Sequence, residues 1–516
     1  MHACLNVDEI VRVIGHELVA SSGKGSAVSL ACCCKSFEDP VLDTLWGTQD
    51  RLFTLLNSLL SDIWKEGRYN VSAQETCLFS FLNFSIRKSF KRPPTPMEWA
   101  RFRKYARRMR ELRQLFTSDS VSPETLSVMQ TCTINEPLLP NLRTLDLMGI
   151  EGCLIPFIPL FLSPGITSIA LKFGSNPSEA MIASTITTLP TLCPDLREIT
   201  LYNFPRSPTI TAAVSGMLLV ANRSTLQEFG VYSPLTEEAS EVLYKLPNLR
   251  GLSVVIRRET RLPSASLPNL TKLAIRCDNE DNWPRLFRGA TLGRLEHVDF
   301  HLESEEIGDF LGAFERAALS SSIQNTLSTF YLSTLCSWNP KYSSLLPFTQ
   351  LVCLVIQFSC DGGCSSTVDD NTVISLSRVM PKLKSLTLGD RPCGQTTGGV
   401  TAKGLLALAH HCPKLSVLCV HLQVAGLGDP PGITGTDPKA ETAASWTDCA
   451  LAEFVVGETP VPEGSTMVIA LTLLRIFPRL DCILFTDEEW GEVLNAINRS
   501  REIMDCSSKQ SPFTTP

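Results

Sequence analysis

Residues 140–147 read PNLRTLDL, and this phrase of a proline, a short polar turn and three spaced aliphatic residues decides the fold. It returns, with aliphatic variants, as PDLREITL at 194–201, PNLRGLSV at 247–254, PNLTKLAI at 268–275, PKLKSLTL at 381–388, PKLSVLCV at 413–420 and PRLDCILF at 478–485. Weaker copies begin at Ile166, Leu226, Leu295, Leu327, Leu351 and Leu451. The last Leu-x-Leu of each phrase alternates apolar and polar residues, which predicts a short strand with both leucines turned into the core.

The copies recur with a mean period of about 28 residues, inside the range of leucine-rich repeats. Between them, apolar residues follow helical spacing, for example Val373, Leu376, Val379 and Met380 ahead of Pro381, where the proline predicts the end of the helix. One repeat cannot cover its own apolar face, so the repeats must stack, with parallel strands on one side and helices on the other. The predicted fold class is α/β, an irregular leucine-rich-repeat solenoid or horseshoe. The alternative is an ordinary α/β protein with chance leucines.

Composition excludes several classes of protein. Of the 516 residues, 44% are hydrophobic and 19% charged, which is enough apolar material for a large core. Acidic residues outnumber basic ones by 53 to 46, which argues against a dedicated nucleic-acid binder. The most apolar stretch, 153–162, is far shorter than the roughly 20 residues of a membrane span, and Asp8, Glu9 and Arg12 interrupt any signal-peptide core. We therefore expect a soluble chain of the cytoplasm or nucleus, with its 19 cysteines as free thiols.

Residues 1–60 differ from the repeats and predict a small all-α unit. Apolar residues at helical spacing mark three amphipathic helices, with faces at Ile10, Val13, Ile14 and Leu18, at Val28, Leu30, Ala31 and Cys34, and at Leu42, Leu45 and Trp46. Three short helices form a core that is marginal alone, so the unit needs a partner surface. After it we expect connecting helices with a basic segment over 61–130, the solenoid over 131–500 and a disordered tail over 501–516.

The run from Leu30 through three cysteines to Phe37, followed by Asp39, Pro40, Leu42, Leu45 and Trp46, resembles an F-box. An F-box ahead of leucine-rich repeats is similar to the substrate receptors of Skp–cullin–F-box ubiquitin ligases, particularly those of fungi. The resemblance implies a chain that performs no chemistry itself: its N-terminal helices bind a Skp-type adaptor of a cullin ligase, and its repeats hold a protein substrate. The adaptor contacts that it implies are Ile10, Val13, Ile14, Leu30, Cys34, Pro40, Leu42 and Trp46.

A basic segment over 87–113 allows two interpretations. It holds eleven Lys and Arg residues against two Glu. Thr95-Pro96-Met97-Glu98 predicts a helix start with a capping box, and Trp99, Phe102, Ala106, Met109 and Leu112 or Arg113 recur at helical spacing. The segment is either a patch for nucleic acid or an acidic partner, or a helix that packs its aromatic stripe inward and leaves a solvated basic face. The second interpretation is favoured, because the aromatic residues share one stripe.

The motifs of catalysis are absent from the sequence. A phosphate-binding loop fails around Lys24, because Leu18 stands where its first glycine belongs, and a zinc-protease helix fails because Ala20 stands where the second His is required. Cys360 and Cys364 could begin a zinc site, but no second close cysteine pair completes it, which favours a turn with free thiols. We predict neither an enzyme nor a bound cofactor or metal.

The residues beside each Leu-x-Leu face the open side of the predicted sheet. There the candidate substrate contacts are Tyr202, Tyr232, Arg276, His297, Asp299, His301 and Tyr331. Aromatic and Arg side chains are the usual energetic anchors of an interface. The alternative is that they are ordinary exposed strand residues.

A second function remains open, a leucine-rich-repeat scaffold for protein interactions with no ligase role. It predicts that the first fifty residues fold back onto the repeats as a cap and bury their apolar faces. An exposed apolar patch on residues 5–46 favours the adaptor hypothesis instead.

Overall fold

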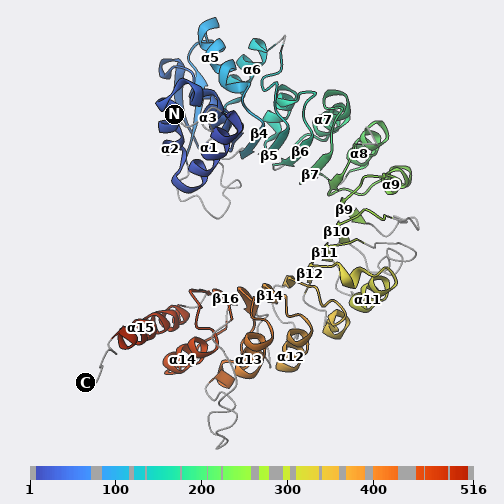
Figure 1. The fold of residues 1–516 in the computed structure, drawn as a ribbon. Coiled ribbons are helices and arrows are strands. Elements are labelled where there is room, and N and C mark those ends of the chain that lie inside the picture. Colours follow the sequence, from blue (N-terminus) through green and yellow to red (C-terminus); the bar gives the residue numbers. More distant parts are fainter. Residues whose placement is uncertain are drawn as a thin grey trace, which may run out of the picture. The chain divides into compact units, whose positions relative to one another are not determined.

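A computed structural model describes the chain in two compact units, Met1–Leu249 and Arg250–Pro516 (Figure 1). The described residues are 7–70, 84–115, 121–133, 136–174, 177–205, 207–221, 225–256, 267–277, 294–302, 309–335, 340–359, 368–389, 399–427, 449–457, 459–485 and 488–509.

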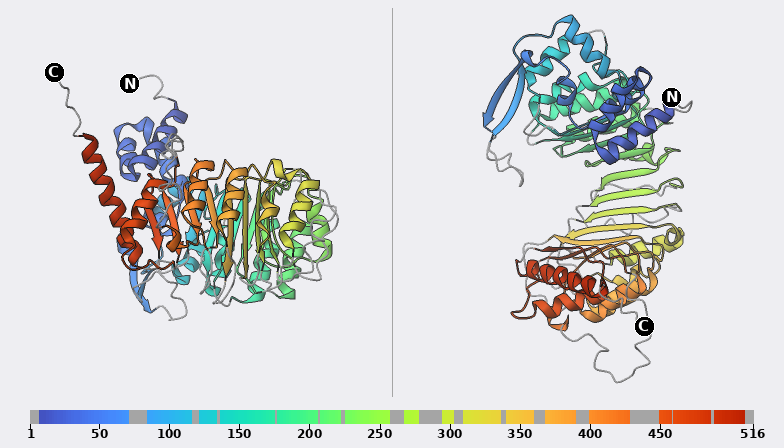
Figure 2. Two further views of the ribbon diagram at one scale, coloured as in Figure 1. Left: turned by 90° about the horizontal axis from the view of Figure 1, so that it is seen from below. Right: turned by 60° about the vertical axis from the view of Figure 1, so that its left-hand side comes forward.

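Strands of the first unit pair in parallel and in chain order. They are β1 (Thr48–Gln49), β4 (Glu111–Leu115), β5 (Thr144–Ile150), β6 (Ser168–Phe173), β7 (Glu198–Tyr202) and β8 (Glu228–Val231). The register places the apolar residues of successive repeats side by side, as in Leu145, Ile169, Ile199 and Phe229, all of them buried. This alignment makes one continuous core from units that are each too small to have one. A separate antiparallel hairpin, β2 (Trp64–Asn70) and β3 (Phe84–Phe90), precedes the repeats (Figure 2).

Helices of the first unit line one face of these strands (Figure 1). They are α4 (Leu52–Leu56), α5 (Pro96–Ala106), α6 (Pro123–Cys132), α7 (Glu179–Leu192), α8 (Pro208–Val220) and α9 (Glu237–Tyr244), with 3-10 turns η2 (Ser61–Ile63) and η3 (Gly152–Phe161). Side-chain caps begin several of them: Ser122, Ser207 and Thr236 each accept a backbone N–H from the first turn of the following helix. Proline follows the first two caps, where its missing N–H costs nothing.

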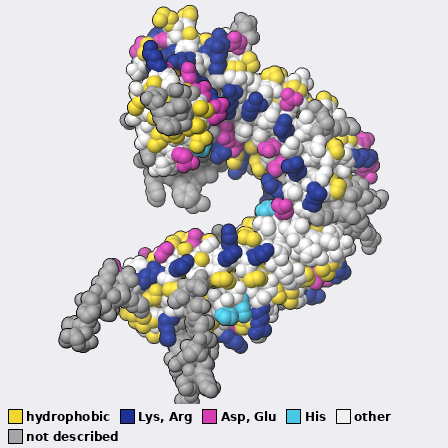
Figure 3. Space-filling model, in the orientation of Figure 1, with side chains coloured by type: hydrophobic (Ala, Val, Ile, Leu, Met, Phe, Trp, Pro, Cys, Tyr) yellow, Lys and Arg dark blue, Asp and Glu magenta, His cyan; other side chains and the backbone are white. Residues whose placement is uncertain are grey.

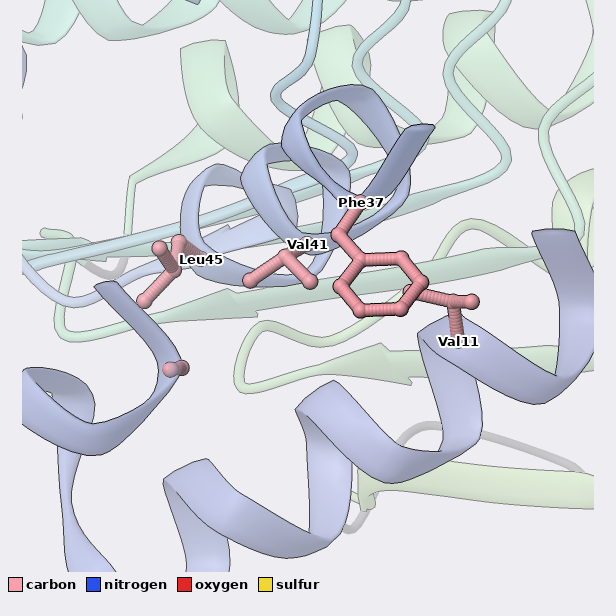
Figure 4. Packing of buried hydrophobic residues seen from close by; sticks show 5 residues of the cluster. Val11, Phe37, Val41 and Leu45 are labelled. Carbon is pink, nitrogen blue, oxygen red and sulfur yellow. The ribbon is translucent and has the colours of Figure 1, made fainter. Parts of the chain in front are cut away.

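Three helices open the chain, α1 (Asp8–Ser22), α2 (Lys24–Cys33) and α3 (Lys35–Gly47), which we call the three-helix unit. Val11 of α1, Ala27 of α2 and Phe37, Val41 and Leu45 of α3 form its buried core. Figure 4 shows Val11 lying against Phe37, with Val41 and Leu45 along the same face of α3. The predicted helical unit is therefore present, and its small core is closed by its own residues.

Strands of the second unit also pair in parallel and in chain order. They are β9 (Gly251–Ile256), β10 (Lys272–Cys277), β11 (His297–Leu302), β12 (Thr329–Leu335), β13 (Cys353–Ser359), β14 (Ser385–Leu388), β15 (Val417–Val420), β16 (Glu453–Gly457) and β17 (Cys482–Phe485). Its helices are α11 (Phe310–Ser320), α12 (Asp370–Val379), α13 (Ala402–His411), α14 (Thr466–Ile476) and α15 (Glu489–Lys509), with turns η5 (Ile323–Asn325), η6 (Tyr342–Leu345) and η7 (Val424–Leu427). The helices cover one face of the strands (Figures 1 and 2).

Aromatic residues and inter-repeat hydrogen bonds hold the second unit together. The buried ring of Phe314 lies 5.4–5.6 Å from those of Phe300, Phe330 and Phe348, which come from successive repeats. Asp370, at the start of α12, accepts hydrogen bonds from the backbone N–H of Thr401 (2.8 Å) and Gly404 (3.1 Å) at the start of α13. Each carboxylate of this kind ties one repeat to the next.

The strand predictions are confirmed, because every clear and weak copy of the phrase coincides with one strand from β5 to β17. The prolines that follow α12, α13 and α14 stand one residue past the last buried side chain, as predicted. The helix expected to run from Thr95 to residue 112 or 113 ends at Ala106, and residues 111–115 form β4. Leu112 fits both the 3.6-residue period of a helix and the two-residue period of a strand. Pairing with β1 and β5 places it in a strand.

At the C-terminus, residues 501–509, which were expected to lie in a disordered tail, belong to α15, which continues to Lys509, and 510–516 lie outside the described residues. Trp490, Val493 and Ile497 of this helix are fully buried, and the indole N–H of Trp490 donates to the carbonyl of Thr459 at 2.6 Å. Burial of its first turns keeps α15 helical beyond the last repeat.

Candidate docking surfaces

An apolar row lies exposed on the three-helix unit. It consists of Val7 (42% exposed), the residue before α1, and of Ile10 (39%) and Val13 (62%) on α1, and we call these three residues the α1 row. Val28 of α2 is 49% exposed as well. Hydrophobic side chains lie among charged ones over these helices in Figure 3. Exposed apolar side chains that lie next to one another mark an interaction site more often than scattered single ones do.

The other predicted adaptor contacts point inward or sideways. Ile14 is half-buried, and Leu30, Cys34, Leu42 and Trp46 pack at the edge of the helical core, while Pro40 is buried. The Trp46 ring lies 4.7 Å from that of Tyr105 in α5, between ring centroids. The structure thus brings Ile10 and Val13 together on one surface and uses the rest mainly for packing. Val7 and Val28 belong to the exposed set but were missing from the predicted list, although their helical spacing could have revealed them.

Cys34 occupies the residue just before α3. Its Sγ lies 3.0 Å from the hydroxyl of Ser36. The hydrogen bonds from the Ser36 side chain and from the first backbone N–H groups of the helix lower the pKa of this thiol. Its place in the structure is that of a helix cap.

A groove of about 880 Å³ borders the α1 row, because Val13 lines both. Its walls come from α1, the start of α2, the end of α3, β1 and the residues before β4, and they carry charges of both signs, including Arg12, Asp43, Asp50 and Arg110. A partner helix laid on the α1 row would therefore have polar groups beside it as well as apolar ones.

An arginine couples the three-helix unit to α5. The Arg108 guanidinium donates to the carboxylates of Asp39 and Asp43, both on α3, and also to the backbone oxygen of Asp39 at 3.1 Å. One turn earlier, Lys104 lies 3.5 Å from the Glu38 carboxylate. The side of α3 that faces α5 is thereby occupied within the chain, whereas the α1 row stays exposed.

The basic segment is neutralised largely by the chain itself. Trp99, Phe102, Ala106 and Met109 are buried, which confirms the packing interpretation of the aromatic stripe. Ion pairs to acidic residues engage Arg92, Arg103, Lys104, Arg107, Arg108 and Arg113. The Arg92 guanidinium and the N–H of Thr95 lower the pKa of Glu98 to about 2. These six cations are therefore offset by carboxylates of the chain itself, while the side chains of Arg87 and Lys88 lie outside those that the structure describes.

The predicted substrate contacts of the first unit stand side by side. Tyr202 and Tyr232, at the ends of β7 and β8, have ring centroids 5.0 Å apart and an interplanar angle of 31°. Burial raises the pKa of Tyr202, so its phenol stays protonated throughout the physiological range.

The predicted contacts of the second unit gather on β10, β11 and β12. The Asp299 carboxylate lies 3.2 Å from His301 Nε2, and the His301 ring lies 5.5 Å from that of Tyr331. In register, His301 stands beside Arg276 of β10. Burial lowers the pKa of His297, against the opposing effect of Asp299. The five residues therefore form one polar cluster, with half-buried side chains of both charges.

A metal or membrane role finds no support in the part of the chain that the structure describes. No group of three or more His, Cys, Asp or Glu side chains there could hold an ion. Cys360 and Cys364, the one zinc candidate of the sequence, lie outside the described residues. Within the same limits, none of the helices has the length and apolar character needed to cross a bilayer.

Fold and surfaces together define a mixed α/β repeat protein with long runs of parallel strands, helices on one face and exposed side chains on the other. No family model matches the sequence, and no curated protein matches it. Among solved structures, the chain is similar to a chain of the yeast Rad7–Elc1 complex, at 18% identity, over 56% of this chain and 79% of that one, with a TM-score of 0.33. Similarity at this level assigns the chain neither a family nor a partner.

Proposed function

We propose that this chain is a substrate receptor of a Skp–cullin–F-box ubiquitin ligase, in the cytoplasm or nucleus. In this proposal the outer side of the three-helix unit docks a Skp-type adaptor, and the open faces of the strands hold a protein substrate. Other subunits carry out ubiquitin transfer.

The exposure of the α1 row is the observation that carries the proposal. The core of the three-helix unit is closed and its α3 side is bound to α5, yet Val7, Ile10 and Val13 stay in water. A cap folded onto the repeats would instead have buried them, which is what the scaffold alternative predicts. The resemblance of residues 30–46 to an F-box supplies the class of partner.

The test is a pull-down of a purified Skp-type adaptor by the full chain and by the double variant Ile10→Asp, Val13→Asp. Both side chains are exposed, so the charges cost the fold little, whereas at an apolar interface they abolish binding. Leu30 and Trp46 are poorer probes, because their replacement disturbs the packing of the unit itself.

The matched control is Val220→Asp, which places a charge on a 72% exposed valine of α8. We expect the wild type and the control to retain the adaptor and the double variant to lose it. Equal retention by all three would show that the α1 row is not the docking surface. Absence of adaptor binding by the wild type would favour the scaffold function.

A further inference from the structure

The strands β4 to β8 present an open face on the side opposite the helices, and one row of side chains crosses it. In register, Arg113, Asp146, Ala170, Thr200 and Gly230 lie next to one another on successive strands. Charged side chains stand at one end of this row, and small or absent side chains at the other. Ala170, Thr200 and Gly230 therefore leave space above the sheet beside the Asp146 carboxylate, and we call these three residues the floor.

Asp146 lacks the partners that a carboxylate usually has in a folded protein. Its Oδ1 is buried, and no described group donates a hydrogen bond to it. Arg113, its neighbour on β4, directs its guanidinium at Glu111, with Nη2 and Nε at 2.7 and 2.9 Å from the same oxygen. Ala170, its neighbour on β6, has no donor to offer. Burial accordingly raises the pKa of Asp146, the sign of an incompletely solvated charge.

The tyrosine pair stands at the other end of the floor. Tyr202 and Tyr232 lie two residues beyond Thr200 and Gly230, and the backbone N–H of Tyr232 donates to the carbonyl of Leu201 at 3.3 Å, which continues the pairing of the strands. In register, Tyr202 stands beside Lys172 of β6 on one side, and its ring faces that of Tyr232 on the other. Aromatic faces of this kind attract a guanidinium through the ring quadrupole.

Charge on this face favours a cationic occupant. Carboxylates outnumber cations there by four to two, being Glu111, Asp146, Glu198 and Glu228 against Arg113 and Lys172. One of the two cations, Arg113, is already paired with Glu111. An acidic ligand would meet repulsion, and a basic one attraction that weakens with salt.

We propose that the open face of the first unit binds an extended, arginine-bearing segment of a partner protein, with one cationic side chain at Asp146 and a second stacked on the Tyr202–Tyr232 pair. The two anchors are two strands and two residues apart, roughly 12 Å, which an extended peptide spans in about three to four residues. This inference rests on the proposed function, since the segment would belong to the recruited substrate, and it names the chemistry of that substrate.

The experiment measures fluorescence anisotropy of labelled peptides titrated with the full chain. The probe is Gly-Ser-Arg-Ser-Ala-Arg-Ser-Gly, and its counterpart carries Glu in place of both Arg. We expect the arginine peptide to bind at least about tenfold more tightly at low salt, with a smaller difference at higher ionic strength. Equal binding of the two peptides would overturn the proposal.

Variants of the chain test whether the arginine peptide binds at this site or is attracted only by the net negative charge of the chain. Asp146→Asn and Tyr202→Ala should each weaken binding of the arginine peptide by about tenfold. Glu179→Gln, which removes a charge from the helix side of the same unit, should leave it unchanged. If Asp146→Asn and Glu179→Gln behave alike, the attraction is non-specific and the site does not exist.

Thermal stability distinguishes a binding role of Asp146 from a structural one, because replacing a residue with a structural role would lower the thermal midpoint. Because Oδ1 of Asp146 is buried without a hydrogen-bond donor, Asp146→Asn should leave the thermal midpoint unchanged or raise it while binding falls. A chain that binds the peptide but not the adaptor would refute only the ligase function, whereas one that binds the adaptor but not the peptide would refute only this inference.

Discussion

Arg108→Ala should lower the local stability of the three-helix unit without unfolding the repeats. The Arg108 side chain is only 14% exposed and joins α5 to both Asp39 and Asp43 of α3. Its removal also leaves Asp39 and Asp43, four residues apart on one helix, with only Arg12, 3.4 Å from Asp43, to offset the repulsion between them. In the proposed receptor this link fixes the adaptor-binding helices relative to the first repeats, so its loss matters for function as well as stability.

The magnitude follows from the exposure of the two partners. A hydrogen bond to a charged group contributes about 1.5–3 kcal/mol when it is shielded from water, and an exposed ion pair under about 1 kcal/mol. Asp43 is 39% exposed and Asp39 is 76% exposed, so both carboxylates regain water once the guanidinium is gone. We expect a loss of about 2 kcal/mol, which corresponds to roughly a 30-fold change in the local opening equilibrium.

Hydrogen exchange followed by mass spectrometry resolves this opening. Amides of α1, α2 and α3 should exchange about 30-fold faster in Arg108→Ala, while those of α7 and α8 keep the wild-type rate. Arg101→Ala is the matched control, since Arg101 lies exposed on α5, the helix that ends two residues before Arg108. Unchanged exchange in the three helices would refute the role of Arg108, and equal acceleration in α7 would mean that the variant weakens the whole unit.

Three further predictions concern the second unit. Trp490→Ala should cost about 3–5 kcal/mol in chemical denaturation, because the side chain is fully buried and its N–H bonds the Thr459 carbonyl; a loss below about 1 kcal/mol would contradict its anchoring role. Burial lowers the pKa of His421 and His297, so the unfolded chain takes up protons first, and the free energy of unfolding should fall as pH drops below about 6.5; a pH-independent midpoint between neutral and mildly acidic solution would oppose this. Asp370→Ala should destabilise by about 1–3 kcal/mol, since two backbone N–H groups at the start of α13 lose their acceptor; calorimetry that shows no change would rule out that tie.

Sequence reasoning succeeded where one short period decides the structure. The phrase at 140–147 and its copies predicted the strands β5 to β17, because alternation with a proline turn leaves a strand one way to bury its leucines. It was less successful at 107–115, where Leu112 suits a helix and a strand equally. Pairing with β1 and β5 makes this segment a strand. The paired residues are far apart in the sequence, 63 residues for Thr48 and Glu111 and 33 residues for Glu111 and Thr144.

The candidate surfaces were predicted in part. Helical spacing marked the apolar residues of the first helices, but spacing cannot say which of two apolar faces is turned to the core. In the structure, Phe37, Val41 and Leu45 are buried in the core of the three-helix unit. Trp46 packs against Tyr105, and the α1 row is exposed. Asp146 received no functional role from the sequence, because a lone acidic strand residue carries no motif. Only the structure shows that the Arg113 guanidinium is directed at Glu111 and that Oδ1 of Asp146 has no hydrogen-bond donor.

The sequence by itself determined the architecture of this protein: repeating phrases that can hide their leucines only by stacking, and a short helical leader of a different period. The tertiary structure alone decided what is left for partners. Ion pairs with carboxylates of the same chain engage six of the eleven basic residues of 87–113, whereas the outer side of α1 and the floor between Asp146 and the tyrosines remain open. The physical reason is that the period of the apolar residues determines which side chains are buried. Which surfaces stay exposed depends instead on ion pairs and packing between residues that are tens of positions apart in the sequence.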